Sequence, residues 1–197
     1  MSIKKKLFTS FSTITLILIG LVAFSVFQMS KMDKEYSFLL DDRAYKIIEA
    51  SKIQNAISLQ GLAIRSYVLR QDSSDLDNMN TQKEIITETM NKIESLFAVE
   101  QMQKEIQNIK EQQVLYNGYV DEIIQFVDKE QMEKATEVLF NSAVPANKAI
   151  QQSINNIVEY QTKEMDTTSS QTTENANLSK TLLIIISIIG SLVAIAL

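Results

Sequence analysis

Residues 4–27 read KKKLFTSFSTITLILIGLVAFSVF, a lysine cluster followed by an apolar run from Leu7 to Phe27. At about 1.5 Å of rise per residue, a helix of this length is about long enough to cross the hydrocarbon core of a bilayer. A second apolar run, TLLIIISIIGSLVAIAL, begins at Thr181 and is still apolar where the sequence stops at Leu197. We therefore predict two membrane-spanning helices, residues 7–27 and residues 181–197, with the second one cut short.

The lysine cluster predicts the orientation of the chain in the cell membrane. Short basic segments tend to stay in the cytoplasm. We therefore expect residues 1–6 to be cytoplasmic and residues 28–180 to form one extracytoplasmic domain. The alternative for residues 1–27 is a cleaved signal peptide, with Ala23-Phe24-Ser25 as a weak cleavage site. The length of the apolar run and the presence of the second run favour an uncleaved anchor.

Composition excludes several classes of function. The sequence has no histidine and no cysteine, so it offers no disulfide, no Cys/His zinc site and no nucleophilic cysteine or catalytic histidine. Its net charge is −5, whereas a nucleic-acid partner needs a basic surface. Methionines lie at helical core positions, which predicts core packing and not copper ligation. We expect no enzymatic activity, no cofactor, no metal and no nucleic-acid partner.

The scarcity of turn residues predicts an all-α fold. The sequence has four glycines and one proline, and only Gly61, Gly118 and Pro145 lie within residues 28–180. Apolar residues recur there at steps of three and four, the period of an amphipathic helix. We predict helices over 28–71, 74–97, 100–128 and 131–180, arranged as an antiparallel up-down-up-down four-helix bundle flanked by the two transmembrane helices.

The ends of these helices follow from local signals. Short polar side chains at Asp72-Ser73-Ser74 can cap the second helix. Pro145 predicts a kink or a restart in the fourth helix. Residues 162–180 are rich in threonine, serine and asparagine, so they form either a mobile linker or a poor helix. We expect a helix, because a mechanical connection to the second crossing requires one.

One segment resembles a known family. Arg65-Ser66-Tyr67-Val68-Leu69-Arg70-Gln71-Asp72 resembles the R-x-Y-x-L-x-x-D segment of the four-helix-bundle sensor domains in bacterial methyl-accepting chemotaxis proteins. The start of a long helix at Pro145-Ala146 is similar as well, and so is the frame of basic N-terminus, crossing, domain and crossing. Members often have a glycine in the corner after the first helix, where this chain has Arg70-Gln71. The resemblance implies a receptor whose cytoplasmic output region lies outside this sequence.

Arg65 is the main candidate for binding a ligand. It lies among apolar neighbours near the distal end of its helix, and we expect Glu122, Thr136 and Glu137 at the same level. An arginine there could hold a ligand carboxylate in bidentate fashion, and the resemblance implies helix-borne arginines of this kind. The alternatives are an ion pair with Glu122 or Glu137, or a guanidinium that reaches out to solvent.

Two tyrosines and one glutamine complete the candidates. Tyr116 and Tyr119 could line a pocket, although the position of Tyr116 on the apolar stripe favours a core role. Gln113 is the polar member of that stripe, and a buried amide of this kind usually fixes helix register. The predicted ligand-binding residues are therefore Arg65, Tyr119 and Thr136.

The leading hypothesis is the ligand-sensing region of a transmembrane chemoreceptor. It would bind a small molecule or a ligand-loaded binding protein, form a homodimer, and signal through its fourth helix and second crossing. Cytoplasmic signalling partners would be reached only through the region beyond this sequence. The alternatives are the sensor region of a membrane histidine kinase or diguanylate cyclase, and a non-signalling, membrane-anchored helical spacer.

Overall fold

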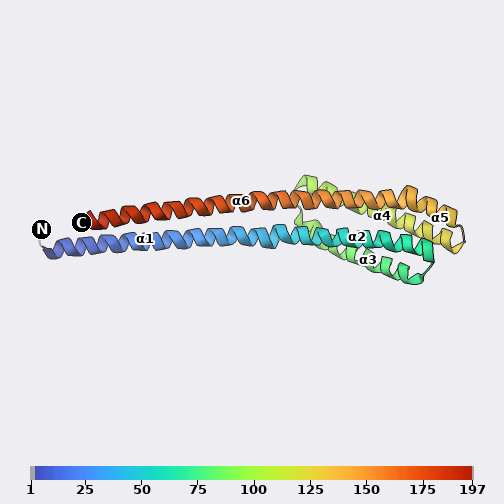
Figure 1. Cartoon of the computed structure of the whole chain (residues 1–197), viewed down its shortest axis with the longest axis horizontal. Coiled ribbons are helices and arrows are strands. Elements are labelled where there is room, and N and C mark those ends of the chain that lie inside the picture. Colours follow the sequence, from blue (N-terminus) through green and yellow to red (C-terminus); the bar gives the residue numbers. More distant parts are fainter. Residues whose placement is uncertain (1–2, 197) are drawn as a thin grey trace. The chain divides into compact units, whose positions relative to one another are not determined.

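The computed structural model describes residues 3–196, and within them every regular element is a helix and none is a strand (Figure 1). The elements are α1 (Ile3–Phe38), η1 (Leu39–Ala44), α2 (Tyr45–Arg70), α3 (Ser73–Ile93), η2 (Glu94–Leu96), α4 (Glu100–Asp128), α5 (Met132–Val138), η3 (Leu139–Ala143) and α6 (Val144–Ala196). The predicted all-α class is confirmed.

The chain divides into two compact units. Arg43–Lys163 forms one, which we call the bundle, and Met1–Asp42 with Glu164–Leu197 forms the other, which we call the stem. The bundle is shorter than the expected domain of residues 28–180, since the polar segments next to the apolar ends group with the stem. The assignment of residues 1–6, 7–27, 28–180 and 181–197 to sides of a membrane stays a prediction.

Four helical rods form the bundle: α2, α3, α4, and the succession of α5, η3 and the first part of α6 (Figure 1). Their apolar faces meet in one core, as the step of three and four residues predicts. Its largest fully buried side chains are Ile53, Ile57, Ile64, Ile86, Ile93, Met102, Ile109, Tyr116, Ile123, Ile150, Ile154 and Ile157. The predicted core role of Tyr116 is confirmed, and Met79 and Met90 are buried as well.

The corner between α2 and α3 forms without glycine. Gln71 adopts the left-handed conformation at φ 54°, and its N–H donates to the Tyr67 carbonyl at 2.8 Å. Asp72 is extended, and its carboxylate accepts a hydrogen bond from the Ser74 N–H at 2.9 Å. These contacts satisfy free groups at both helix ends. The predicted corner is therefore confirmed.

The other two corners also avoid glycine. Phe97 and Val99 are extended between η2 and α4, and the Phe97 ring is buried in the core. After α4 the chain turns through Glu130, at φ 59°. The Gln131 N–H then donates to the Phe126 carbonyl at 2.8 Å. Both corners lie between the helices predicted over 74–97, 100–128 and 131–180.

The helix before Pro145 takes a wider turn instead of a break. Leu139–Ala143 is a π-helical segment, and the Val144 N–H donates to the Leu139 carbonyl. A π-helical turn leaves carbonyls without their usual partner four residues on. Pro145 has no N–H to offer such a carbonyl, so it fits directly after this segment. The predicted irregularity at Pro145 thus takes the form of a π-helical turn.

Residues 162–180 are helical, as predicted, because α6 continues without interruption to Ala196. Its hydroxyl side chains bond to carbonyls one turn back. Thr168 donates to Glu164 O at 2.9 Å, and Thr172 donates to Thr168 O at 2.9 Å. Such bonds satisfy the hydroxyl groups inside the helix.

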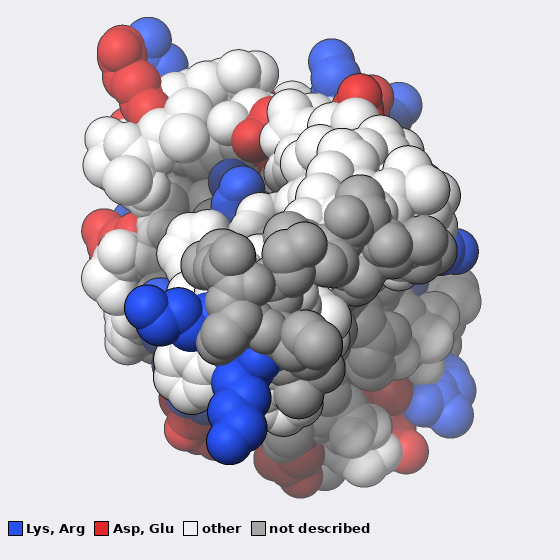
Figure 2. Space-filling view, turned by 90° about the vertical axis from the view of Figure 1, so that its left-hand side faces the viewer, with Lys and Arg blue, Asp and Glu red and all other residues white. Residues whose placement is uncertain are grey.

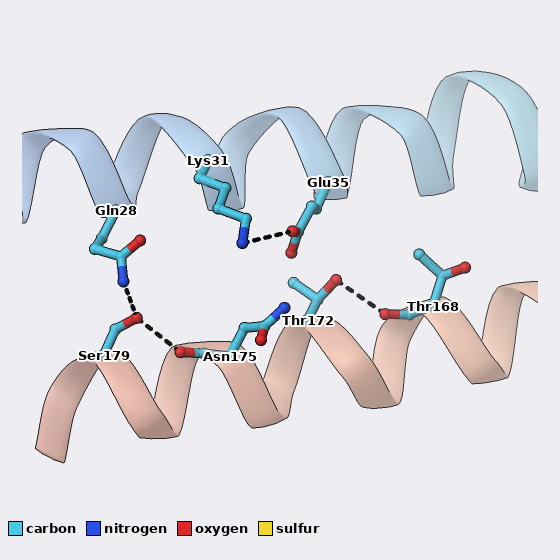
Figure 3. A network of polar contacts seen from close by, with 7 residues as sticks. All are labelled: Gln28, Lys31, Glu35, Thr168, Thr172, Asn175 and Ser179. Carbon is cyan, nitrogen blue, oxygen red and sulfur yellow. Dashed lines mark hydrogen bonds and ion pairs between the residues drawn. The ribbon is translucent and has the colours of Figure 1, made fainter. Parts of the chain in front are cut away.

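In the stem, polar side chains join α1 to the later part of α6 (Figure 3). The Gln28 side-chain amide donates to the Ser179 hydroxyl, which itself donates to Asn175 O at 2.7 Å. Glu35 points from α1 toward Thr172, which is only 1% exposed (Figure 3). The stem helices therefore contact each other through polar groups next to their apolar ends.

The ends of the stem are apolar and exposed. Two helices, Phe8–Arg70 and Met132–Val193 when the π-helical turns are included, are long and apolar enough to cross a membrane. Their apolar segments are not buried by other parts of the chain, which suits side chains that face lipid. Lys4 and Lys5 are exposed, and basic side chains stand at the front of the view onto this end (Figure 2).

Candidate ligand-binding site

The predicted ligand-binding residues come from three helices of the bundle. Arg65 on α2 and Tyr119 on α4 are partly buried, whereas Thr136 on α5 is exposed. Among the described residues, no hydrogen bond or ion pair joins Arg65 to Glu122, Thr136 or Glu137. Arg65 donates instead to the Gly61 carbonyl at 3.0 Å. The internal ion pair considered for Arg65 is thus not formed.

Arg65 belongs to a group of polar side chains inside the bundle, which we call the polar layer. It comprises Gln60, Arg65, Gln113, Tyr116, Asn117 and Asn147, from helices α2, α4 and α6. A polar layer in an otherwise apolar core is costly unless its groups are paired. The polar groups of this layer that lack a hydrogen-bond partner therefore indicate which ligand chemistry the site could bind.

Asn147 connects α6 to α2 within this layer. Its side chain is buried, and its amide donates to the Ile57 carbonyl at 3.0 Å. The contact depends on Gly61, since a Cβ atom there would lie 3.1 Å from Asn147 Nδ2 and 3.3 Å from Arg65 Nη1. Gly61 is therefore the small residue that lets Asn147 and Arg65 reach the α2 backbone.

Tyr116 brings a buried hydroxyl to the same place. Burial raises the pKa of Tyr116 to about 12, although the nearby charge of Arg65 and the Asn147 side chain act in the opposite direction. The hydroxyl is consequently protonated at neutral pH. It makes no well-formed hydrogen bond with a described residue, so its proton remains available as a donor.

The glutamine pair lies on the neighbouring turns of α2 and α4. Gln113 Nε2 donates to Gln60 Oε1 at 3.2 Å and to Asn117 Oδ1 at 3.1 Å. Gln60 is fully buried, yet Gln60 Nε2 has no partner in the described part of the chain. The predicted role of Gln113 in fixing helix register is consistent with this contact between helices.

The free groups of the polar layer are mostly donors. The free donors are the remaining N–H groups of Arg65, the Tyr116 hydroxyl and Gln60 Nε2, and Gln113 Oε1 is a buried acceptor without a partner among the described residues. A guanidinium beside neutral donors suits an anion, above all a carboxylate. Residues 3–196 contain no group of three His, Cys, Asp or Glu residues that could hold a metal ion.

Sequence reasoning found Arg65 but missed Gln60 and Asn147 as partners. Gln60 interrupts the apolar stripe of α2, and Asn147 stands one turn before Ile150 on α6. A polar amide at a core position was therefore the available signal. Which helices would meet at that position depends on the corners, and a single sequence does not specify them closely enough.

The fold and this layer define an all-helical bundle module joined to apolar helices. The sequence matches the family described as a four helix bundle sensory module for signal transduction over residues 1–176. The chain therefore belongs to this family of sensory modules, and the predicted family resemblance is confirmed. A comparison with curated proteins finds no match.

Proposed function

We propose that the chain is the ligand-sensing region of a transmembrane chemoreceptor of the methyl-accepting type. Residues 28–180 lie outside the cell and residues 7–27 and 181–197 lie in the cell membrane. The supporting observations are the match to a sensory module, the apolar ends and the exposed lysines near the N-terminus. The chain acts by binding a ligand and not by catalysis.

The ligand is a small carboxylate, and Arg65 holds it. The observation that carries this proposal is a partly buried guanidinium whose hydrogen bond goes to a backbone carbonyl and not to an acidic side chain. A carboxylate can accept two parallel N–H bonds from such a group. The Tyr116 hydroxyl adds a neutral donor, and we expect Tyr119 and Thr136 to contact the ligand, as the sequence predicts.

The signal travels along α6. Asn147 bonds to α2 one turn from Gly61, whose carbonyl is the present partner of Arg65. A ligand that draws Arg65 away from Gly61 changes the contact between α2 and α6. Because α6 is one continuous helix to Ala196, a displacement of about 1–2 Å, typical of helix shifts in receptors, can pass along it.

The functional unit is a homodimer that associates through α2. Besides its core face, α2 has a second apolar face, which we call the outer stripe, formed by Tyr45, Ile48, Leu59, Leu62 and Leu69. Leu62 is 60% exposed and Leu69 is 83% exposed. The members of the outer stripe are separated by combinations of three- and four-residue steps, so they lie along one side of α2, as residues at the interface of two packed helices do. The outer stripe of a second copy is self-complementary to it.

Carboxylate binding tests the role of Arg65. The full chain in lipid nanodiscs is titrated by calorimetry with a panel of mono- and dicarboxylates, from acetate to citrate. For a carboxylate that binds, we expect Arg65→Gln to weaken the affinity at least about tenfold, the effect of losing a charged hydrogen bond. Lys148→Gln, an exposed cation next to Asn147, should leave it unchanged. Equal binding to the Arg65→Gln variant would contradict the proposal.

Cross-linking tests the path through α6. The chain has no natural cysteine, so Gln28→Cys with Ser179→Cys places one reporter pair where the two side chains meet in the stem. The carboxylate identified by calorimetry should change the rate of disulfide formation. Adding Arg65→Gln should remove that change. An unchanged rate with a bound carboxylate would rule out transmission through this part of α6.

A further inference from the structure

A second candidate site lies between α2 and α3, apart from the residues of the polar layer. It is a groove of about 550 Å³ at the surface of the bundle. Leu59, Leu62 and Ala63 of α2 provide an apolar wall, and Asp75 and Gln82 of α3 provide polar groups. Arg70, from the last turn of α2, also lines it.

Asp75 is the unusual residue of this groove. It lies in the first turn of α3 and is only 4% exposed. Asp75 Oδ1 accepts a hydrogen bond from Arg70 Nη2 at 2.7 Å. Asp75 Oδ2 is buried as well and has no hydrogen-bond partner among the described residues. The carboxylate is therefore only half satisfied.

The two members of this ion pair differ in burial. The Asp75 side chain is 6% exposed, whereas the Arg70 side chain is 60% exposed. A buried carboxylate with a free oxygen carries a desolvation cost that a further donor would relieve. An exposed arginine, in contrast, can move into water at little cost. The arrangement holds the negative charge in place and leaves its present cation replaceable.

We propose that this groove binds a small organic cation, a primary ammonium ion with a short apolar chain. Its ammonium group takes the place of Arg70 and donates to both oxygens of Asp75. Its chain lies against Leu59, Leu62 and Ala63. Charge complementarity at Asp75 selects the cation, and the apolar wall selects a hydrocarbon chain over a metal ion.

This site is independent of the proposed carboxylate site, since it shares no residue with the polar layer. Leu59 and Leu62 also belong to the outer stripe. The apolar wall of the groove therefore adjoins the proposed dimer interface. The charged end of the site, formed by Asp75 and Arg70, lies within one copy.

The experiment is a calorimetric titration of the full chain in nanodiscs with n-butylammonium as the probe and n-butanol as its neutral counterpart. We expect saturable binding of n-butylammonium and no measurable binding of n-butanol. Asp75→Asn keeps the shape of the side chain and removes its charge, so it should weaken binding at least about tenfold. Asp77→Asn, an exposed aspartate on the same helix, should bind like the parent chain.

The Arg70→Gln variant distinguishes a ligand-binding role of the Arg70–Asp75 ion pair from a purely structural role, in which the pair acts as a clamp that closes the corner between α2 and α3. Removal of the competing cation leaves Asp75 uncompensated, so this variant should bind n-butylammonium at least about fivefold more tightly. A clamp that only closes the corner would give no such gain. The Gln82→Lys and Gln82→Glu variants test charge without touching the ion pair, and the lysine variant should bind more weakly than the glutamate variant.

The outcomes that overturn the proposal are equally definite. It fails if the Arg70→Gln variant binds n-butylammonium no more tightly than the parent chain. It also fails if Asp75→Asn has no effect, or if n-butanol binds as well as the cation. Loss of carboxylate binding in the Arg65→Gln variant has no bearing on any of these results, so the two proposals stand or fall separately.

Discussion

Beside Gly61, the Asn147 side chain of α6 contacts the backbone of α2. Asn147 and Arg65 both approach this glycine, and each donates to a nearby carbonyl of α2. The lack of a side chain at Gly61 therefore has a packing reason, since its backbone is ordinary helix. A glycine inside a helix otherwise costs about 1 kcal/mol relative to alanine.

A matched pair of alanine substitutions tests this role. Gly118→Ala meets no atom within 4 Å, so it should stabilise the chain by about 0.5–1 kcal/mol through helix propensity. Gly61→Ala gains the same propensity but displaces the Asn147 amide and leaves buried groups unpaired, a loss of about 1–3 kcal/mol. Urea unfolding followed by circular dichroism should rank the Gly61→Ala variant below Gly118→Ala. The reverse order would show that Asn147 adapts freely.

The sequence predicted the importance of Arg65 but not its surroundings. The arginine stands out because it interrupts an apolar stretch. Its partners were inferred by counting turns back from the helix corners, which suggested Glu122 and Glu137. In the structure both glutamates are exposed, and the atoms near Arg65 belong to Gly61, Tyr116 and Asn147. Helix rotation, which sets such neighbours, depends on packing across the whole bundle.

At the scale of elements, a local cap explains why the start of α3 was predictable, whereas α4 and α5 begin without a side-chain cap. The Asp72 carboxylate caps α3, and a cap is a local signal that the sequence displays. The π-helical segment at Leu39–Ala44 was not predicted, and the one at Leu139–Ala143 was predicted only as an irregularity at Pro145. A π-helical turn is a rare interruption within an α-helix, and the apolar three-and-four pattern of the sequence does not specify where one forms.

The cap of α3 makes stability depend on pH. Hydrogen bonds from Ser74 hold the pKa of Asp72 below its usual range, with a smaller contribution from Arg70. Because the pKa is lower in the folded state, the stabilisation is complete above the unfolded pKa of about 3.9. It is lost as pH falls through the folded pKa. Asp72→Asn, which also caps but does not titrate, should therefore lose less stability on acidification.

Thermal unfolding of the two proteins between about pH 6 and pH 2 measures the effect of Asp72. The stability difference between the parent chain and Asp72→Asn should shrink as the pH falls below about 4. Asp77→Asn, an exposed aspartate on the same helix, is the control. A difference that stays constant over this range would mean that the charge of Asp72 does not contribute to the cap.

The outer stripe of α2 leads to a prediction about association. Ile48 and Leu69 are exposed at positions on that stripe, and neither lines the groove that holds Asp75. We expect Ile48→Glu combined with Leu69→Glu to convert a dimer into a monomer, because two carboxylates would be buried without partners. Multi-angle light scattering of the purified chain measures the mass. The matched control, Val114→Glu with Phe140→Glu, alters exposed apolar residues elsewhere. Equal masses for both double variants would argue against the stripe.

At the scale of the whole molecule, the sequence alone was sufficient for the all-α class and the sensory-module family. Apolar runs at both ends and a polar, helix-forming middle predict an anchored bundle, and the match to a sensory module agrees with that prediction. The ligand could not be predicted. It depends on a few side chains, such as Gln60 and Asn147, whose meeting is a consequence of how three helices pack.

The account rests most directly on which side of the membrane the bundle lies, and single cysteines can measure it. The chain has no cysteine of its own, so Lys5→Cys and Gln107→Cys, both at exposed positions, report the two sides without background. A membrane-impermeant maleimide is applied to intact cells and to permeabilised cells. We predict that Gln107→Cys reacts in intact cells and that Lys5→Cys reacts only after permeabilisation. Labelling of both in intact cells, or of Gln107→Cys only after permeabilisation, would contradict the account.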